Sequence, residues 1–139
     1  MFKRIMLPLD LTSKHRQAVD IAAELARQSG GDVTLLHVIE EIRGLAMDEE
    51  QAFFQRLEQA AKNGLDEVGR PLGERGISWR SLIRYGNRVN EVARCAEEIG
   101  TDLIVVTGPR LDPQHPALSW GSLSWKIGIL GPCPVLMVK

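Results

Sequence analysis

The sequence predicts a doubly wound α/β fold, in which one five-stranded parallel sheet carries helices on both faces. Three observations predict it: short apolar runs rich in Val, Ile and Leu, intervening segments with apolar residues at helical spacing, and Gly or Pro at the boundaries. Strict alternation of strand and helix implies parallel strands joined by right-handed crossovers. At 139 residues the length is that of one domain, 1–139.

The first half of the chain supplies two strands and the helix between them. Residues 2–8 are expected to form a strand that closes at Pro8. Thr12 or Ser13 then caps a helix that ends near Gln28, where glycines stop it. Residues 32–39 are almost continuously apolar, which suits a strand that is covered on both faces.

The second half continues the alternation. After a linker, 41–47, a helix is predicted from Met47 to about Leu72, and its glycines weaken that prediction at the far end. The next strand, 77–84, alternates more strongly, so it is placed at or near an edge of the sheet. The remaining predicted elements are a helix over 88–99 capped by Asn87, a strand over 102–106, a helix around 119–130 and a last strand over 134–138.

Bulk composition excludes several classes of function. Apolar and charged residues make up 44% and 25% of the chain, and the net charge is −1, so there is no basic field for nucleic acid or an anionic membrane. No apolar run is long enough to cross a membrane, and no apolar signal segment opens the chain, so we expect a cytoplasmic protein. Cys95 and Cys133 form no CxxC pair, which favours buried free thiols over a zinc or redox site.

The segment after the fourth strand is typical of an anion site. Gly108 ends an apolar run, and Gly121 and Ser122 open a helix, whose unpaired N–H groups and dipole favour a phosphate. With the strand order 3-2-1-4-5, the ends of strands one and four flank the crevice where such sheets bind ligands. The loop between the glycines carries three prolines and Leu111, which disfavour the same site.

Four segments, in order, resemble the universal stress protein family over essentially the whole chain. Ile5-Met-Leu-Pro-Leu-Asp10 resembles the opening strand of the family, Leu35-Leu-His-Val38 the second and Asp102-Leu-Ile-Val-Val106 the fourth. Gly131-Pro-Cys-Pro-Val-Leu-Met-Val138 resembles the closing strand. The resemblance implies a Rossmann-like fold of the adenine nucleotide alpha hydrolase-like type and a role in the stress response.

ATP-binding members of the family carry the pattern G-x2-G-x9-G-(S/T) after the fourth strand. Here the first glycine falls on Gly108 and the last pair on Gly121-Ser122, but the middle glycine is replaced by Leu111. The resemblance implies ATP or another adenine nucleotide as the ligand. The implied adenine contacts are Pro8, Asp10 and Val38, and the implied phosphate and ribose contacts are Gly108, Gly121 and Ser122.

Alternatives stay open for these residues. Asp10 either contacts a nucleotide or caps the helix that follows it, and Ser122 either holds phosphate or caps its own helix. Arg110 either pairs with a phosphate or is a solvated loop residue, and His37 is more simply a core residue than a ligand. Leu111 and the loop prolines favour a rival function, a nucleotide-free protein-interaction module.

Neither a Walker A lysine motif nor a nucleophile elbow or metal-binding His cluster is present, so the sequence predicts no enzyme beyond slow ATP hydrolysis.

The last strand, 134–138, is apolar and would lie at a sheet edge that must be covered. The residues there permit the pairing by which relatives form homodimers. The sequence thus predicts a homodimeric regulatory module with a nucleotide ligand, which can also serve an unidentified protein partner.

Overall fold

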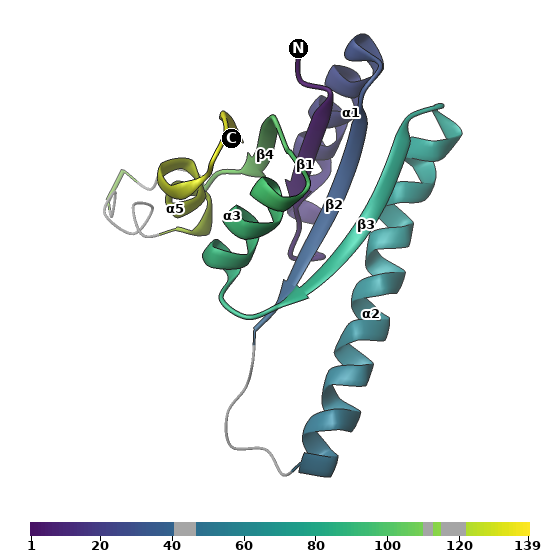
Figure 1. The fold of residues 1–139 in the computed structure, drawn as a ribbon, viewed down its shortest axis with the longest axis vertical. Helices are drawn as coiled ribbons and strands as arrows, with labels where there is room; N and C mark the ends of the chain where they lie inside the picture. Colours follow the sequence, from purple (N-terminus) through teal and green to yellow (C-terminus); the bar gives the residue numbers. More distant parts are fainter. Residues whose placement is uncertain (41–46, 110–112, 115–121) are drawn as a thin grey trace.

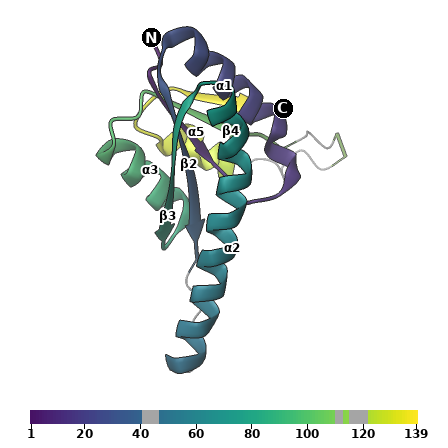
Figure 2. The same ribbon diagram turned by 90° about the vertical axis from the view of Figure 1, so that its right-hand side faces the viewer.

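The structure is a computed structural model that describes residues 1–40, 47–109, 113–114 and 122–139. It confirms the predicted fold class: five parallel strands lie in the order β3-β2-β1-β4-β5, with helices on both faces. Figure 1 shows the layers, and Figure 2 shows the same arrangement from the side. The strands are β1 (Arg4–Pro8), β2 (Asp32–Ile39), β3 (Ser78–Tyr85), β4 (Leu103–Thr107) and β5 (Val135–Val138).

A tight turn joins β1 to the first helix. Leu11 takes a positive φ of 67°, an uncommon conformation for a leucine. A short 3-10 helix, Ser13–His15, follows Thr12 and runs directly into α1 (Arg16–Ser29). The helix ends as predicted, because Gly30 adopts the left-handed conformation (φ 71°) and its N–H bonds to the carbonyl of Ala26.

The long helix α2 (Met47–Glu74) runs two residues past its predicted end and extends well beyond the sheet (Figure 1). One of the glycines that weakened the prediction, Gly69, is explained by packing. A Cβ on Gly69 would lie 2.2 Å from the ring of Trp79, so α2 approaches β3 closely where a glycine leaves room for the indole. β3 is an edge strand, as its alternation predicted.

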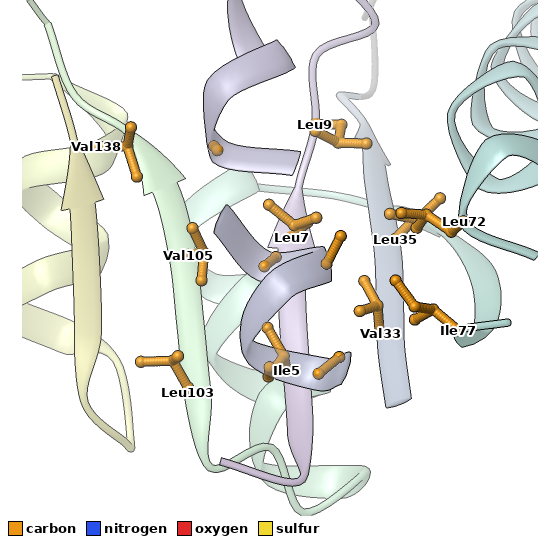
Figure 3. Close-up of a cluster of buried hydrophobic side chains, with 14 of the residues drawn as sticks. Ile5, Leu7, Leu9, Val33, Leu35, Leu72, Ile77, Leu103, Val105 and Val138 are labelled. Atoms are coloured by element: carbon orange, nitrogen blue, oxygen red, sulfur yellow. The ribbon is translucent and has the colours of Figure 1, made fainter. Parts of the chain in front are cut away.

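Two apolar cores lie on opposite faces of the sheet. The first packs under α1 and α2 and contains Ile5, Leu7, Val33 and Leu35 (Figure 3). The second packs under α3 (Arg88–Glu98) and α5 (Leu123–Leu130). Neighbouring residues along β1 point to opposite cores, which explains why parallel strands are apolar throughout. The second core is formed by Met6, Leu36, Val38, Val92, Cys95, Ala96, Ile104, Val106 and Ile127.

The two later helices begin at caps that the sequence indicated. The Asn87 side chain accepts a hydrogen bond from the N–H of Asn90 (3.1 Å), and that of Ser122 accepts one from Trp125 (3.3 Å). The predicted start of the last helix, near 119, falls outside the described residues. No helix in the described part of the chain is both long and apolar enough to span a bilayer.

Candidate functional site

A pocket of about 450 Å³ opens at the carboxyl ends of β1 and β4, where the order of the strands reverses. This is the position at which open α/β sheets bind their ligands. Its floor is apolar and belongs to the second core: Leu36, Val38, Val92, Val106 and Ile127. Its rim is polar and includes Asp10, Lys14, His15, His37, Arg88, Thr107, Ser122, Ser124 and Lys139.

The structure brings most of the predicted site residues together. Pro8, Asp10, Val38, Gly108 and Ser122 all line this one pocket. Gly121, Leu111 and Arg110 lie outside the described residues.

The carboxylate of Asp10 already has several donors. Oδ1 accepts hydrogen bonds from the hydroxyl of Thr12 (2.7 Å) and its N–H (3.1 Å), and lies 2.6 Å from Nε2 of His15. Oδ2 pairs with Nζ of Lys14 at 2.7 Å. Burial raises the pKa of Asp10, but the hydrogen bonds from Lys14, Thr12 and His15 outweigh it and hold the pKa well below its usual range. Asp10 therefore organises the turn that starts α1, and a ligand that approaches its carboxylate competes with the hydrogen bonds from Thr12, Lys14 and His15.

On its β1 side, the main chain of Val38 lies beside the pocket, beyond the end of the β1–β2 pairing. Leu36, two residues earlier, accepts a hydrogen bond from the N–H of Leu9 (2.8 Å), so its polar groups face β1. Because alternate residues of a strand face the same neighbour, the N–H and C=O of Val38 face the same side. There β1 has ended at Pro8, and the carbonyl of Leu9 is bound by Nδ1 of His37 (2.7 Å). Both main-chain groups of Val38 are thus directed toward the pocket side.

Gly108 is used by the sheet itself. Its N–H donates to the carbonyl of Val138 at 2.7 Å, which continues the pairing of β4 with β5. Its φ is not in the left-handed region. A Cβ at this position would lie 2.5 Å from Cγ of Met137 and 2.8 Å from its Sδ. The requirement for glycine here is explained by packing against β5, and Pro109, which follows, has no N–H to offer.

The first turn of α5 forms the opposite side of the pocket. Ser122, Leu123 and Ser124 all line it, and the hydroxyls of the two serines lie 3.2 Å apart. N–H groups in the first turn of a helix have no acceptor within the helix, and the dipole there favours an anion. Of the described lining residues, Lys14, Arg88 and Lys139 are basic and Asp10 is acidic. The rim therefore favours an anionic group above an apolar floor.

Sequence reasoning missed two residues that the fold brings to Asp10. His15, whose exposed fraction is only 9%, contacts Asp10 through Nε2 and places Nδ1 2.8 Å from the hydroxyl of Thr107. Thr107 is 92 residues away in the sequence. The short sequence separation of Asp10 and His15 could have indicated their contact. The position of Thr107, in contrast, depends on β4 lying beside β1.

The two cysteines are free thiols in different settings. Cys95 is buried, as expected, whereas Cys133 is only half-buried, and burial raises the pKa of both. Among residues 1–40, 47–109, 113–114 and 122–139, no group of three or more His, Cys, Asp or Glu is arranged to hold a metal ion.

The sequence pattern of the universal stress protein family matches residues 1–139. The chain belongs to the universal stress protein family. Among curated members, it is 27% identical to the universal stress protein YxiE of Bacillus subtilis, with both chains covered completely. It is 25% identical to the universal stress protein MJ0577 of Methanocaldococcus jannaschii, over 100% of this chain and 96% of that one.

Solved structures agree on the fold. The structure of MJ0577 superposes with a TM-score of 0.85 over 100% of this chain and 96% of that chain. A universal stress protein in complex with cAMP is 18% identical, with a TM-score of 0.75 and 99% and 96% of the two chains covered. The universal stress protein from Archaeoglobus fulgidus in complex with dAMP is 17% identical, with a TM-score of 0.74 and both chains covered completely. At these identities the likeness of the last two supports the shared fold.

Proposed function

We propose that this member of the universal stress protein family is a regulatory module that binds an adenine nucleotide, ATP or a relative of it, without efficient hydrolysis. The single observation that carries the proposal is the pair of main-chain groups on Val38, directed to a pocket with an apolar floor and a basic rim. Family members of the same fold that are in complex with cAMP and dAMP support the same ligand class.

The Val38 pair favours adenine over guanine. An adenine ring presents its amino group as a donor next to a ring nitrogen that accepts, which complements a C=O and an N–H. Guanine presents an oxygen where adenine has the amino group, so the C=O of Val38 would face another acceptor. One unpaired buried group costs about 1–3 kcal/mol, or roughly tenfold to a hundredfold in affinity.

In the proposed pose, the sugar and phosphates extend from Val38 toward β4 and α5. Asp10 and Pro8 flank the base and sugar, and Ser122 and the first turn of α5 receive the phosphates. The family pattern assigns the same role to Gly121, which lies outside the described residues. Lys14 pairs with the carboxylate of Asp10 (2.7 Å). In this pose a sugar hydroxyl takes the place of Lys14 on that carboxylate. The freed ammonium then remains at the rim as a counter-charge for the phosphates.

Isothermal titration with ATP, AMP and GTP tests the proposal. The expected result is binding of ATP and AMP, with GTP at least about tenfold weaker. Equal affinity for GTP would refute base recognition at Val38. Absence of heat with every nucleotide at millimolar concentration would leave the rival function, a nucleotide-free interaction module. A tenfold gain in ATP affinity for Leu111→Gly would attribute weak binding to that leucine, which replaces the middle glycine of the family pattern.

We also propose that the module is a homodimer paired through the last strand, 134–138. β5 is an edge of the sheet, and Leu136 on it is 38% exposed. Since the carbonyls of Pro134 and Val138 bond to β4, the polar groups of Val135 and Met137 face the free edge, where a second copy can pair. Sedimentation of Leu136→Lys should show a monomer, whereas Ser78→Lys on the opposite edge strand should stay dimeric. A dimeric Leu136→Lys would contradict this interface.

A further inference from the structure

Three side chains from separate segments form a continuous hydrogen-bonded chain at the rim of the pocket. The Thr107 hydroxyl lies 2.8 Å from Nδ1 of His15, and Nε2 of the same ring lies 2.6 Å from Oδ1 of Asp10. Thr107 ends β4, Asp10 follows β1, and His15 ends the short 3-10 helix before α1. All three line the pocket. A nucleophile, a base within hydrogen-bond reach and a third group that orients the base constitute the arrangement required for nucleophilic catalysis.

The direction of the protons follows from the partners. A carboxylate can only accept, so the 2.6 Å contact requires a proton on Nε2 of His15. The main-chain N–H of Asp10 is 3.5 Å from the same nitrogen, a far weaker contact. In the neutral ring Nδ1 is then an acceptor, so the hydroxyl of Thr107 donates to it. The low pKa of Asp10, which its donors maintain against burial, keeps this carboxylate ionised. His15 is therefore oriented as a base toward Thr107.

The surroundings of Thr107 suit an acyl group. Thr107 lies on the same face of the sheet as Val105, and on that face the apolar residues Leu9, Ala18 and Val138 line the pocket and carry no charge that an acyl chain would have to displace. The first turn of α5 lines the same pocket, and its N–H groups can stabilise the negative oxygen of a tetrahedral intermediate.

We propose that Thr107 is an acyl-accepting nucleophile and that this pocket hydrolyses small carboxylic esters with an apolar acyl group, with His15 as general base and Asp10 as the residue that positions it. The activity goes beyond nucleotide binding and requires no nucleotide.

The step balances without a further reactant other than water. Oγ of Thr107 forms a bond to the ester carbonyl carbon as its proton moves to Nδ1 of His15. The bond to the alcohol oxygen then breaks, and that oxygen takes the proton from His15, which leaves an acyl ester on Thr107. Water attacks this ester by the same route, releases the carboxylic acid and restores the hydroxyl.

The experiment is hydrolysis of p-nitrophenyl acetate and p-nitrophenyl butyrate by the purified full chain. We expect Thr107→Val to lose about a hundredfold or more in kcat/KM and Thr107→Ser to stay within about tenfold of the wild type. His15→Gln should lose a similar factor, and the double variant should be no slower than either single one, because the residues act as a unit. Thr101→Val is the matched control, since Thr101 lies two residues before the start of β4, at the end of the strand away from the pocket, and this variant should hydrolyse at the wild-type rate.

A second readout does not depend on the variants folding. Acid quench of the wild type during turnover, followed by peptide mass spectrometry, should find the acetyl group on Thr107. Acetyl found only on lysines such as Lys14, or Thr107→Val as fast as Thr101→Val, would overturn the proposal. A wild type no faster than free imidazole at the same concentration would overturn it as well. None of these three results bears on nucleotide binding, which the titration with ATP measures separately.

Discussion

Replacement of Gly108 by alanine should separate packing from ligand binding at the residue where the family pattern begins. The new Cβ would lie 2.5 Å from Cγ and 2.8 Å from Sδ of Met137, so the methionine must move by about an ångström to restore ordinary contact. Overpacking of this kind costs about 1–3 kcal/mol, and the lower chain entropy of alanine returns about 0.4–1 kcal/mol. We expect Gly108→Ala to lower the free energy of unfolding by about 1–2 kcal/mol.

A double-mutant cycle with Met137→Ala tests the reason for that loss. Met137→Ala removes both clashing atoms, so Gly108→Ala in this background should be neutral or slightly stabilising, with a coupling energy of about 1–3 kcal/mol. Urea unfolding followed by tryptophan fluorescence measures all four proteins, at one protein concentration because dimerisation would contribute to stability. If Gly108→Ala costs the same in both backgrounds, the contact with Met137 is not what requires a glycine.

Four further substitutions should change the free energy of unfolding. Gly69→Ala should lower the free energy of unfolding by about 1–3 kcal/mol, because the new Cβ would lie 2.2 Å from the Trp79 ring. In contrast, a Cβ on Gly128 in α5 meets nothing within 4 Å, so Gly128→Ala should raise the free energy of unfolding, measured in urea, by about 0.5–1 kcal/mol. Thr101→Val should raise the free energy of unfolding by about 1 kcal/mol, because the buried hydroxyl has no partner among the described residues. Asp10→Asn should cost about 1–3 kcal/mol at pH 7. Since the folded pKa of Asp10 lies below its unfolded value near 3.8, that difference should persist above pH 4 and shrink as acid takes the wild type through the folded pKa; a constant difference in acid would contradict it.

The regular part of the fold could be predicted because its signals are local. The 32–39 strand matches β2 at both ends, and Asn87 caps α3 as its side-chain chemistry favours. The crevice between β1 and β4 followed from alternation together with the strand order 3-2-1-4-5, and Pro8, Asp10 and Val38 all reach it. Elements of this kind depend on periodicity and caps within a few residues of each other.

What the sequence could not supply are contacts made across the sheet. Thr107 meets His15 only because β4 lies next to β1, and no spacing in the sequence records that. Gly69 reads as a helix breaker until Trp79 is placed against it from β3. Likewise Asp10 looked available to a ligand, yet Thr12, Lys14 and His15 already occupy it. The role of a polar group depends on its hydrogen-bond partners, and those partners are set by the tertiary structure.

The position of Gly108 changes how the family glycine pattern should be interpreted in this chain. Its N–H is bound to Val138 and the space above its Cα is filled by Met137, so β5 alone explains the glycine. Nucleotide affinity in the Gly108→Ala, Met137→Ala double variant therefore distinguishes two roles. If the glycine serves only packing, the double variant binds ATP like Met137→Ala alone, and recognition depends on Val38 and the first turn of α5. If the double variant is as stable as Met137→Ala but binds at least about tenfold more weakly, a phosphate approaches Gly108 directly.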